Sequence, residues 1–307
     1  MEHPKIFASC HNHSDFSDAD MSPEELVALA HSLGHGGIIL TDHDTVQGTY
    51  FINKAARRLG MKSLLGCEFS TYHNGVSIHL CGFDFNPDNQ AVKEILAYGS
   101  SVQTERSRVM FEMGLERGSL RKGCTWEEVR AAFPYNDYLC NNQVFKVMVA
   151  KGIYRPEEYD SDFLPNNFSL RLGLEDQIRE ITKKSYRNIE TADVIRVIRE
   201  AGGVPVVAHP YGFEDMANEL IELGVMGFET RHSCFRNDRP VRYPHAEESR
   251  LFFEQLCEEH QLYKMGGADH EGELGGYLAY GDNYFCPDYL SGILEEDFMK
   301  IYERRLG

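Results

Sequence analysis

The chain has 307 residues, of which 42% are hydrophobic and 26% charged, and its formal net charge is −17. This length and composition are those of a globular protein with a full hydrophobic core, built as one large domain or as one domain with an insertion. The acidic charge disfavours binding to nucleic acid, which requires clustered Lys and Arg, so we expect a small substrate rather than a nucleic-acid polymer.

The first 85 residues alternate between strand and helix patterns. A strand is predicted over residues 5–10, and it leads directly into His11 and His13. The next helix opens with Ser22 as its N-cap and with Pro23 just inside. The other elements predicted in this part are a strand at 36–41, a helix through 55–59, and strands at 62–69 and 76–85 that a turn at 73–75 joins.

Residues 88–185 differ from the first 85 residues in composition and in predicted secondary structure. They are more polar, and helices are predicted over 92–118, 125–133 and 142–151. No strand in this stretch ends in a residue of the metal-ligating type. We therefore predict an inserted helical subdomain over 88–185 that covers the site as a lid.

The alternation resumes after the insertion. Strands are predicted over 204–208, 227–232 and 263–269, with helices over 193–201, 216–223 and 245–260. Strands that alternate with helices indicate a parallel sheet, and in parallel barrels the active site lies at the carboxyl ends of the strands. His, Asp or Glu repeatedly occupies those ends in this chain, which predicts a centre with several metal ions.

The spacing of His11 and His13 is the strongest local signal. Side chains two apart on a strand share a face, so both imidazoles can reach one ion. Asp18 and His43 can add ligands to the same or a neighbouring site. A single His at a strand end is usually structural, but this spacing favours metal binding. Glu68 follows an apolar strand, where an unpaired carboxylate would be costly.

Six segments, taken together and in order, resemble the PHP (polymerase and histidinol phosphatase) family, whose members are phosphoesterases of the amidohydrolase-like type. They are His11-Asn12-His13-Ser14-Asp15-Phe16-Ser17-Asp18, Thr41-Asp42-His43-Asp44-Thr45, Gly66-Cys67-Glu68, Ile78-His79-Leu80, Ala208-His209-Pro210 and Gly267-Ala268-Asp269. The resemblance implies an α/β fold, a distorted seven-stranded (βα) barrel formed by residues 1–87 and 186–286. The helical insertion interrupts this barrel, and a C-terminal tail at 287–307 packs on it.

The resemblance also implies two or three divalent metal ions. The first would bind His11, His13, Glu68 and Asp269. The second would share Glu68 and add His79 and His209, and the third would bind Asp18 and His43. Mixed His and carboxylate ligands suit Zn, Mn or Fe. Glu68 and Asp269 would be catalytic, because they hold the ions that a hydroxide bridges for attack on phosphorus.

The last motif departs from the family pattern. The family usually has Gly-Ser-Asp-x-His-Gly, whereas residues 267–272 read Gly-Ala-Asp-His-Glu-Gly. Either Glu271 replaces the expected imidazole or local backbone geometry brings in His270. Adjacent strand residues face opposite ways, so Glu271 is the preferred match for the third ion.

Four basic residues are candidates for binding a substrate phosphate. Arg231 and His232 end a predicted strand, and Arg106 and Lys146 lie in the insertion, where a solvent-facing helix position is the simpler interpretation. Asp42 and Asp44 flank His43 and are expected to cap its loop or to orient it.

The predicted function is hydrolysis of a small phosphomonoester or phosphodiester of nucleotide or sugar type. An amidohydrolase or a nuclease on the same scaffold is the alternative. The eight cysteines contain no Cys-x-x-Cys and resemble no disulfide framework, which predicts a reducing, cytoplasmic location. No signal peptide and no apolar run of membrane-spanning length is visible, so no membrane partner is expected.

Overall fold

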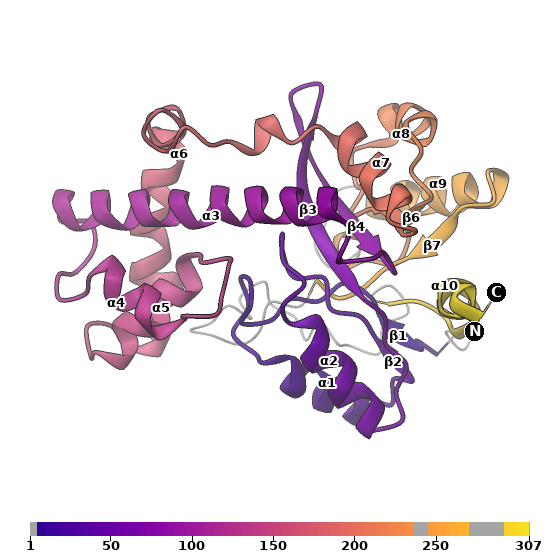
Figure 1. Cartoon of the computed structure of the whole chain (residues 1–307), viewed down its shortest axis with the longest axis horizontal. Coiled ribbons are helices and arrows are strands. Elements are labelled where there is room, and N and C mark those ends of the chain that lie inside the picture. The colour runs from indigo at the N-terminus through magenta and orange to yellow at the C-terminus, as the bar shows by residue number, and fades with distance from the viewer. Residues whose placement is uncertain (1–4, 236–244, 270–291, 307) are drawn as a thin grey trace.

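The architecture is that of an α/β protein, seen in a computed structural model (Figure 1). The structure describes residues 5–235, 245–269 and 292–306. The strands within these ranges are β1 (Ala8–Ser9), β2 (Gly37–Ile38), β3 (Gly66–His73), β4 (Val76–Phe83), β5 (Val204–Val207), β6 (Gly227–Glu229) and β7 (Tyr263–Met265). The helices are α1 (Pro23–Ser32), α2 (Thr49–Arg58), α3 (Gln90–Arg117), α4 (Trp126–Ala132), α5 (Asn141–Ala150), α6 (Leu164–Thr182), α7 (Thr191–Glu200), α8 (Ala217–Leu223), α9 (Ala246–Glu259) and α10 (Glu295–Tyr302).

The strands form two sheets. β1 and β2 pair in parallel, and the second sheet has the order β3-β4-β5-β6-β7. Within it β5, β6 and β7 are parallel, as the alternation with helices predicts. The pairs β3–β4 and β4–β5 are antiparallel, so the predicted hairpin through the turn at 73–75 is confirmed and the sheet is mixed rather than parallel throughout. The cause is the tight turn at Asn74 and Gly75, both with positive φ, which reverses the chain directly into β4.

Backbone hydrogen bonds link the edges of the two sheets. His43 forms an isolated parallel bridge with Glu68, which joins the segment after β2 to β3. At the other edge Cys10 N donates to Gly266 O at 3.0 Å, and Asp269 N donates to His11 O at 2.9 Å. The named strands nevertheless fall into two separate sheets, so closure into a seven-stranded barrel stays a prediction.

Strands β1 and β2 are shorter than predicted, and the side chain of Asn12 cross-links the segments that follow them. Its Nδ2 donates to Ser9 O at 3.1 Å and to Ile39 O at 2.8 Å. Backbone bonds join the same segments, from Ile39 N to Ser9 O at 2.9 Å and from Thr41 N to Asn12 O at 2.8 Å. Asn12 therefore helps to hold the segment that carries the first candidate ligands against the segment that leads to His43.

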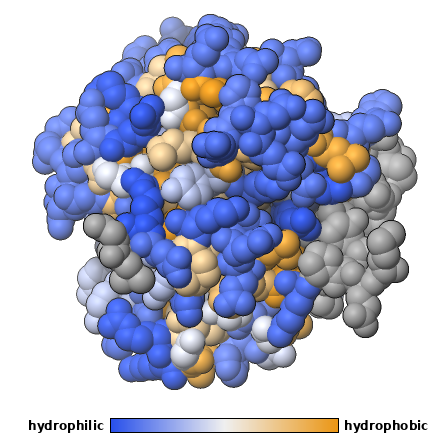
Figure 2. Space-filling view, turned by 90° about the vertical axis from the view of Figure 1, so that its right-hand side faces the viewer, coloured by the Kyte–Doolittle hydropathy of each residue, from blue (hydrophilic) through white to orange (hydrophobic). Residues whose placement is uncertain are grey.

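Three apolar clusters pack against the sheets, and one of them joins α1 and α2 to β2. The other two are larger. One joins the outer faces of β3–β6 to α7, α8 and α9 through residues such as Phe69, Ile198, Phe228 and Phe253. The other gathers residues from β1, β4, β5 and β7 with Phe298 of α10. Figure 2 shows the side of the molecule on which α9 and α10 lie, where hydrophilic residues dominate and hydrophobic ones form small separate groups.

Helices α3–α6 lie to one side of the sheets (Figure 1). They have an apolar cluster of their own, centred on Phe111, Phe145, Tyr159 and Phe163. The predicted helices at 92–118, 125–133 and 142–151 correspond to α3, α4 and α5, while α6 was not predicted separately. None of the helices in the described ranges is long and apolar enough to cross a membrane.

Candidate metal centre

The predicted ligands converge from the ends of strands that are far apart in sequence. His11 and His13 follow β1, His43 follows β2, Glu68 and His79 lie within β3 and β4, His209 follows β5, and Asp269 follows β7. His11, His13 and Glu68 are almost completely buried. The structure therefore brings together every predicted ligand that it describes. Glu271 and His270 lie outside the described residues.

Glu68 is the centre of this cluster. Its Oε2 lies 3.1 Å from His11 Nε2, 3.3 Å from His13 Nε2 and 3.3 Å from His43 Nδ1. Its Oε1 lies 2.9 Å from His79 Nδ1 and 3.0 Å from His209 Nε2. Five imidazoles thus surround one buried carboxylate, and its two oxygens face different sets of rings.

Two further carboxylates complete the cluster. Asp269 Oδ1 lies 3.0 Å from His13 Nε2 and 3.5 Å from His11 Nε2. Asp18 Oδ1 lies 3.4 Å from His13 Nδ1, and its Oδ2 lies 3.4 Å from His43 Nε2. Ring and carboxylate atoms of the triplets His11–His13–Asp269, His13–Asp18–His43 and His43–Glu68–His79 lie within 4.8 Å of one another.

Left-handed backbone occurs at two of these residues. His209 has a φ of 32° and Asp269 a φ of 53°. Such values cost energy in residues other than glycine and concentrate at functional sites. The Asp269 conformation is fixed by its backbone bond to His11, and His209 N donates to Glu229 Oε2 at 2.6 Å. The backbone is therefore held so that both side chains join the cluster.

Glu229, at the end of β6, is a functional residue that the sequence analysis missed. It is fully buried, and its Oε1 lies 2.9 Å from His11 Nδ1. The signal was the one used for Glu68, a carboxylate that closes an apolar strand. Cys81 also approaches this point, with its Sγ 3.6 Å from His11 Nδ1.

The candidate substrate-binding residues lie in different environments. His232 is buried, with its Nε2 3.5 Å from Asp269 Oδ2, so it belongs to the metal centre. Arg231 lies 3.3 Å from Glu254 of α9. Lys146 donates to the backbone O of Asp20 at 3.2 Å. Arg106 lines a cavity of about 520 Å³ beside Asp18, His43 and His79.

Asp42 and Asp44 organise the loops beneath the cluster. Asp42 accepts hydrogen bonds from Ser14 N, Ser14 Oγ and Ser17 Oγ, each at 2.7 Å. Asp44 accepts from Ser70 N at 3.1 Å. Asp42 thus positions the loop that leads from His13 to Asp18, and Asp44 fastens the His43 loop to β3.

The charges of the cluster stabilise one another. Burial alone would lower the pKa of His43, but Glu68 and Asp18 raise it to about 9. Burial would raise the pKa of Asp18, but His43 and His13 lower it to about 2. The pKa of Glu68 is held well below its usual range against burial by His11, His43 and His79. The carboxylates are therefore ionised, as metal ligands must be.

The cluster fits divalent metal ions. His13 Nδ1, His43 Nδ1 and His232 Nε2 are buried and have no partner in hydrogen-bonding geometry among the described residues. A buried nitrogen without a partner is costly, and a bound cation would use its lone pair. Imidazole together with carboxylate is a donor set that suits Zn, Mn or Fe.

Comparisons with known proteins agree with this geometry. The PHP domain model matches residues 9–136. The chain is 28% identical over 224 residues to a 5′-3′ exoribonuclease of Haemophilus influenzae, covering 71% of this chain and 74% of the relative. It is 26% identical over 277 residues to a 3′,5′-nucleoside bisphosphate phosphatase of Chromobacterium violaceum, covering 87% and 88%.

A solved structure from Bifidobacterium adolescentis, described as a putative metal-dependent phosphoesterase, has a similar fold. The TM-score is 0.71 at 24% identity, and the match covers 99% of this chain and 98% of the other. The likeness extends along the whole chain and therefore includes the α3–α6 region as well as the two sheets.

Proposed function

We propose that this protein, whose residues 9–136 match the PHP domain model, is a metal-dependent phosphoesterase that hydrolyses a small phosphorylated substrate. The observation that carries the proposal is the position of Glu68, a buried carboxylate touched by five imidazoles. Apolar side chains at these five positions would pack the core without burying polar rings, so folding stability alone does not explain the five imidazoles. Their convergence is explained if they hold cations.

Glu68 is the residue that would bridge two ions. His11, His13 and Asp269 would complete the first site on the side of Oε2, and His79 and His209 the second on the side of Oε1. Asp18 and His43 would hold a third ion, with Glu271 or His270 as a further ligand. The separate sets of rings around the two Glu68 oxygens support this assignment.

Divalent cations at these positions would polarise a phosphoryl group and lower the pKa of a water molecule for attack. The residues of the protein would hold these cations and orient their ligands. Glu68 and Asp269 stay ionised and hold the positive charge in place. Glu229 fixes the orientation of His11. The loop around Asp42 fixes the course of the chain from His13 to Asp18. The cavity next to Asp18 and His79 would admit the substrate.

We also propose that residues 1–87 and 186–286 form a seven-stranded barrel, with 88–185 as a lid and 287–307 as a tail on the barrel. The backbone bonds from Cys10 to Gly266 and from Asp269 to His11 support closure. The separate apolar cluster of α3–α6 supports the insertion, and the packing of Phe298 supports the tail. The buried cysteines fit a cytoplasmic location.

A 5′-3′ exoribonuclease is the second candidate. The relative from Haemophilus influenzae has this activity in its name, so the expectation that nucleic acid is excluded stays a prediction. The net charge of −17 disfavours an extended surface that binds a long RNA. Activity on long RNA that exceeds activity on mononucleotides would favour this candidate.

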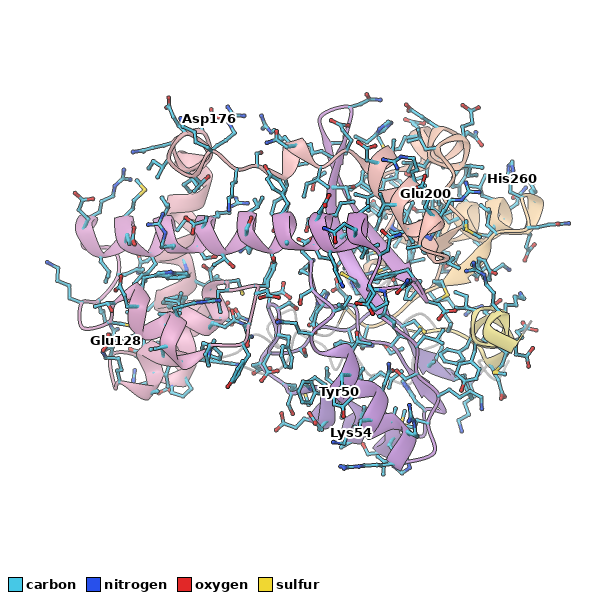
Figure 3. The ribbon with its side chains drawn as sticks, viewed as in Figure 1. Tyr50, Lys54, Glu128, Asp176, Glu200 and His260 are labelled. Carbon is cyan, nitrogen blue, oxygen red and sulfur yellow. The ribbon has the colours of Figure 1, made fainter. Side chains whose placement is uncertain are left out.

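The decisive experiment is a phosphate-release screen across phosphorylated metabolites with the metal-loaded protein. His13→Ala and Glu68→Gln should lower kcat/KM by at least about 10³-fold, because each removes a ligand of the proposed centre. His260→Ala is the control, since His260 is exposed at the end of α9 (Figure 3) and is not among the candidate ligands.

Metal content of the same preparations should be measured in parallel, because loss of ions must accompany loss of turnover. Turnover that survives in folded His13→Ala or Glu68→Gln would contradict the proposal. So would a wild-type protein that cleaves amides but releases no phosphate from any ester.

A further inference from the structure

Two buried polar side chains lie close in sequence to the first candidate ligands without being ligands themselves. Ser9 is the last residue of β1, and Asn12 stands between His11 and His13. Ser9 and Asn12 are both 0% exposed, and neither lines the cavity beside the metal centre. A substrate in that cavity would not touch them, so their role follows from their hydrogen-bond partners.

The partners of the Asn12 amide fix its orientation. Its nitrogen donates to Ser9 O at 3.1 Å and to Ile39 O at 2.8 Å, which uses both of its protons. Because backbone carbonyls only accept, the amide cannot be turned round. Its Oδ1 therefore faces Ser9 Oγ, at a distance of 2.8 Å, and accepts the hydroxyl proton.

The Ser9 hydroxyl acts as a donor and as an acceptor at once. Its single proton goes to Asn12, so towards any further group it can only accept. Ala268 N donates to Ser9 Oγ at 3.1 Å. The hydrogen bonds from Ala268 N to Ser9, from Ser9 to Asn12 and from Asn12 to Ile39 O thus form a continuous series, here called the Ser9–Asn12 network.

The Ser9–Asn12 network joins three segments that carry candidate ligands. Asn12 lies between the first two of these ligands, Ala268 directly precedes Asp269, and Ile39 lies four residues before His43. Each donor in the network has its acceptor, so removal of one side chain leaves another buried polar group without a partner.

The bond to Ser9 also changes the backbone pairing between the segments after β1 and β7. Cys10 N donates to Gly266 O at 3.0 Å, as in a parallel ladder. In a regular ladder the next bond would run from Ala268 N to Cys10 O. Ala268 N donates to the Ser9 hydroxyl instead, so a side chain takes the place of a backbone carbonyl.

The pairing resumes one residue further along both segments, and this places Asp269 in the cluster. Asp269 N donates to His11 O at 2.9 Å, and Asp269 has a left-handed φ of 53° at this point. Its Oδ1 lies 3.0 Å from His13 Nε2 and 3.5 Å from His11 Nε2. A return to the regular ladder would move the backbone of Asp269 and, with it, this carboxylate.

We propose that Ser9 is a positioning residue of the metal centre. Its hydroxyl withdraws the amide hydrogen of Ala268 from the ladder and thereby sets the register at which Asp269 enters the cluster. Asn12 holds the hydroxyl in the orientation that this requires. The inference rests on the proposed function, because Asp269 is a ligand only if the centre binds metal.

Ser9→Ala tests this role, because it removes the hydroxyl and little else. We expect the affinity for the ion at the first proposed site to fall about 10- to 100-fold in competition with a graded chelator. Ser9→Thr keeps a hydroxyl at a strand position that suits a β-branched side chain, and it should restore most of this affinity. The absorption spectrum of the cobalt-loaded protein, which reports ligand number and geometry, should change in Ser9→Ala and not in Ser9→Thr.

Thr191→Val is the matched control. Thr191 is also fully buried, and its hydroxyl lies 2.7 Å from that of Thr71, a residue that adjoins no candidate ligand. Ser9→Ala and Thr191→Val should both lower the Tm of the chelator-treated protein, since each removes a buried hydrogen bond. Only Ser9→Ala should lower the affinity for metal. An unchanged affinity in Ser9→Ala, or an equal fall in Thr191→Val, would overturn the inference.

Hydrogen exchange in the chelator-treated protein requires neither metal nor turnover. The amide hydrogen of Ala268 should exchange at least about tenfold faster in Ser9→Ala than in Thr191→Val if it loses its acceptor, and that of Asp269 should do so if the ladder becomes regular. Unchanged exchange at both amides would overturn the role of Ser9. If Ser9→Ala does not fold, Ser9→Cys takes its place, because a thiol is a weak donor and acceptor.

These outcomes separate the inference from the proposed function. A wild type that binds metal but releases no phosphate would overturn the proposed function and leave the role of Ser9 in place. A wild type that hydrolyses phosphoesters, with a Ser9→Ala variant of equal metal affinity, would overturn the role of Ser9 alone. A wild type that binds no metal would overturn both.

Discussion

At the scale of single residues, His11 shows how the candidate centre is oriented. Its Nδ1 lies 2.9 Å from Glu229 Oε1, and its Nε2 lies 3.1 Å from Glu68 Oε2. An ionised carboxylate can only accept, so a proton on Nδ1 is donated to Glu229. With Nδ1 protonated in this way, Nε2 could present a lone pair to a metal ion in place of a proton shared with Glu68. The other oxygen of Glu229 holds the backbone of His209.

Glu229→Gln tests this role. The amide keeps the size of the side chain, but its NH₂ group would face a donor, either His11 Nδ1 or His209 N. We expect metal affinity to fall about 10- to 100-fold while the fold is retained. Metal retained during competition with a graded chelator measures the change.

Asp297→Asn is a suitable control for Glu229→Gln, because Asp297 is also buried but pairs with Lys300 on α10. The control should retain its metal. Unaltered metal affinity in Glu229→Gln would show that the carboxylate does not orient the ligands.

Residue types and spacing were sufficient to predict much of this cluster. His11, His13 and Glu68 can be identified because each follows a run of mostly apolar residues. The same reasoning applied to 227–229 identifies Glu229 as well. His232, for which substrate binding stays a prediction, lies in the cluster with its Nε2 3.5 Å from Asp269 Oδ2, since the chain turns at the end of β6. The left-handed backbone of His209 and Asp269 depends on distant contacts and cannot be read from local sequence.

At the scale of elements, the insertion holds the loop that carries Asp18. Asn136 Nδ2 donates to Asp15 O at 2.7 Å, and Lys146 Nζ to Asp20 O at 3.2 Å. Asn142 donates to Asp18 O, and Gln143 donates to Ser17 O. Side chains from α5 and the segment before it thus bind a run of carbonyls on either side of the candidate ligand.

A double variant, Asn136→Ala with Lys146→Met, should loosen this loop. We expect the affinity for the ion at Asp18 and His43 to fall on the order of tenfold, since a ligand held less firmly loses more entropy on binding. The number of ions per chain after dialysis against a weak chelator is the readout. The other ions should be retained.

Lys151→Met serves as the control for the double variant, because Lys151 lies at the end of the same helix but pairs with Glu128 on the surface. If the double variant retains the full number of ions at wild-type affinity, the insertion is not needed to position Asp18.

The elements differ in how well local sequence predicts them. The start of α1 was predicted correctly, because Ser22 accepts from Glu25 N and Pro23 follows it. Helices α3, α4 and α5 of the insertion are predicted with boundaries within a few residues, whereas α6 is not predicted separately. Strands β1, β2, β6 and β7 are shorter than predicted. No local pattern signals that the amide of Asn12 will add side-chain bonds to Ser9 O and Ile39 O beside the backbone pairing of these segments.

At the scale of the whole molecule, the two sheets meet where the ligands lie. A Cβ atom on Gly267 would be 2.2 Å from His11 N, so the chain segments after β1 and β7 approach too closely for a side chain. This glycine belongs to the motif at 267–269 that the resemblance identified. Pairing between residues so distant in sequence could be inferred only from the family, and the division into two sheets could not be inferred at all.

Removal of metal should destabilise the entire fold. Ions that bind the folded state alone add about 2.7 kcal/mol when their free concentration is 100 times Kd. A chelator should therefore lower Tm by roughly 5 °C or more for a chain of this size. Calorimetric scans with and without chelator measure this, and re-addition of Zn, Mn or Fe should restore Tm in the order of affinity.

The Glu68→Gln variant is the reference for this scan. The chelator should change the Tm of this variant little, because the variant lacks Glu68, the ligand that the first and second proposed sites share. An equal Tm shift in wild type and variant would show that the chelator acts elsewhere, and the absence of a shift in wild type would contradict tight binding by the folded chain.

The contact between His13 and Asp269 joins residues separated by 256 positions. During synthesis on the ribosome, His11 and His13 emerge long before Asp269, their carboxylate partner. A nascent chain thus presents two imidazoles without that carboxylate until residue 269 has been made. Any truncated product that stops before Asp269 lacks this ligand, so metal retention would separate such products from molecules that include Asp269.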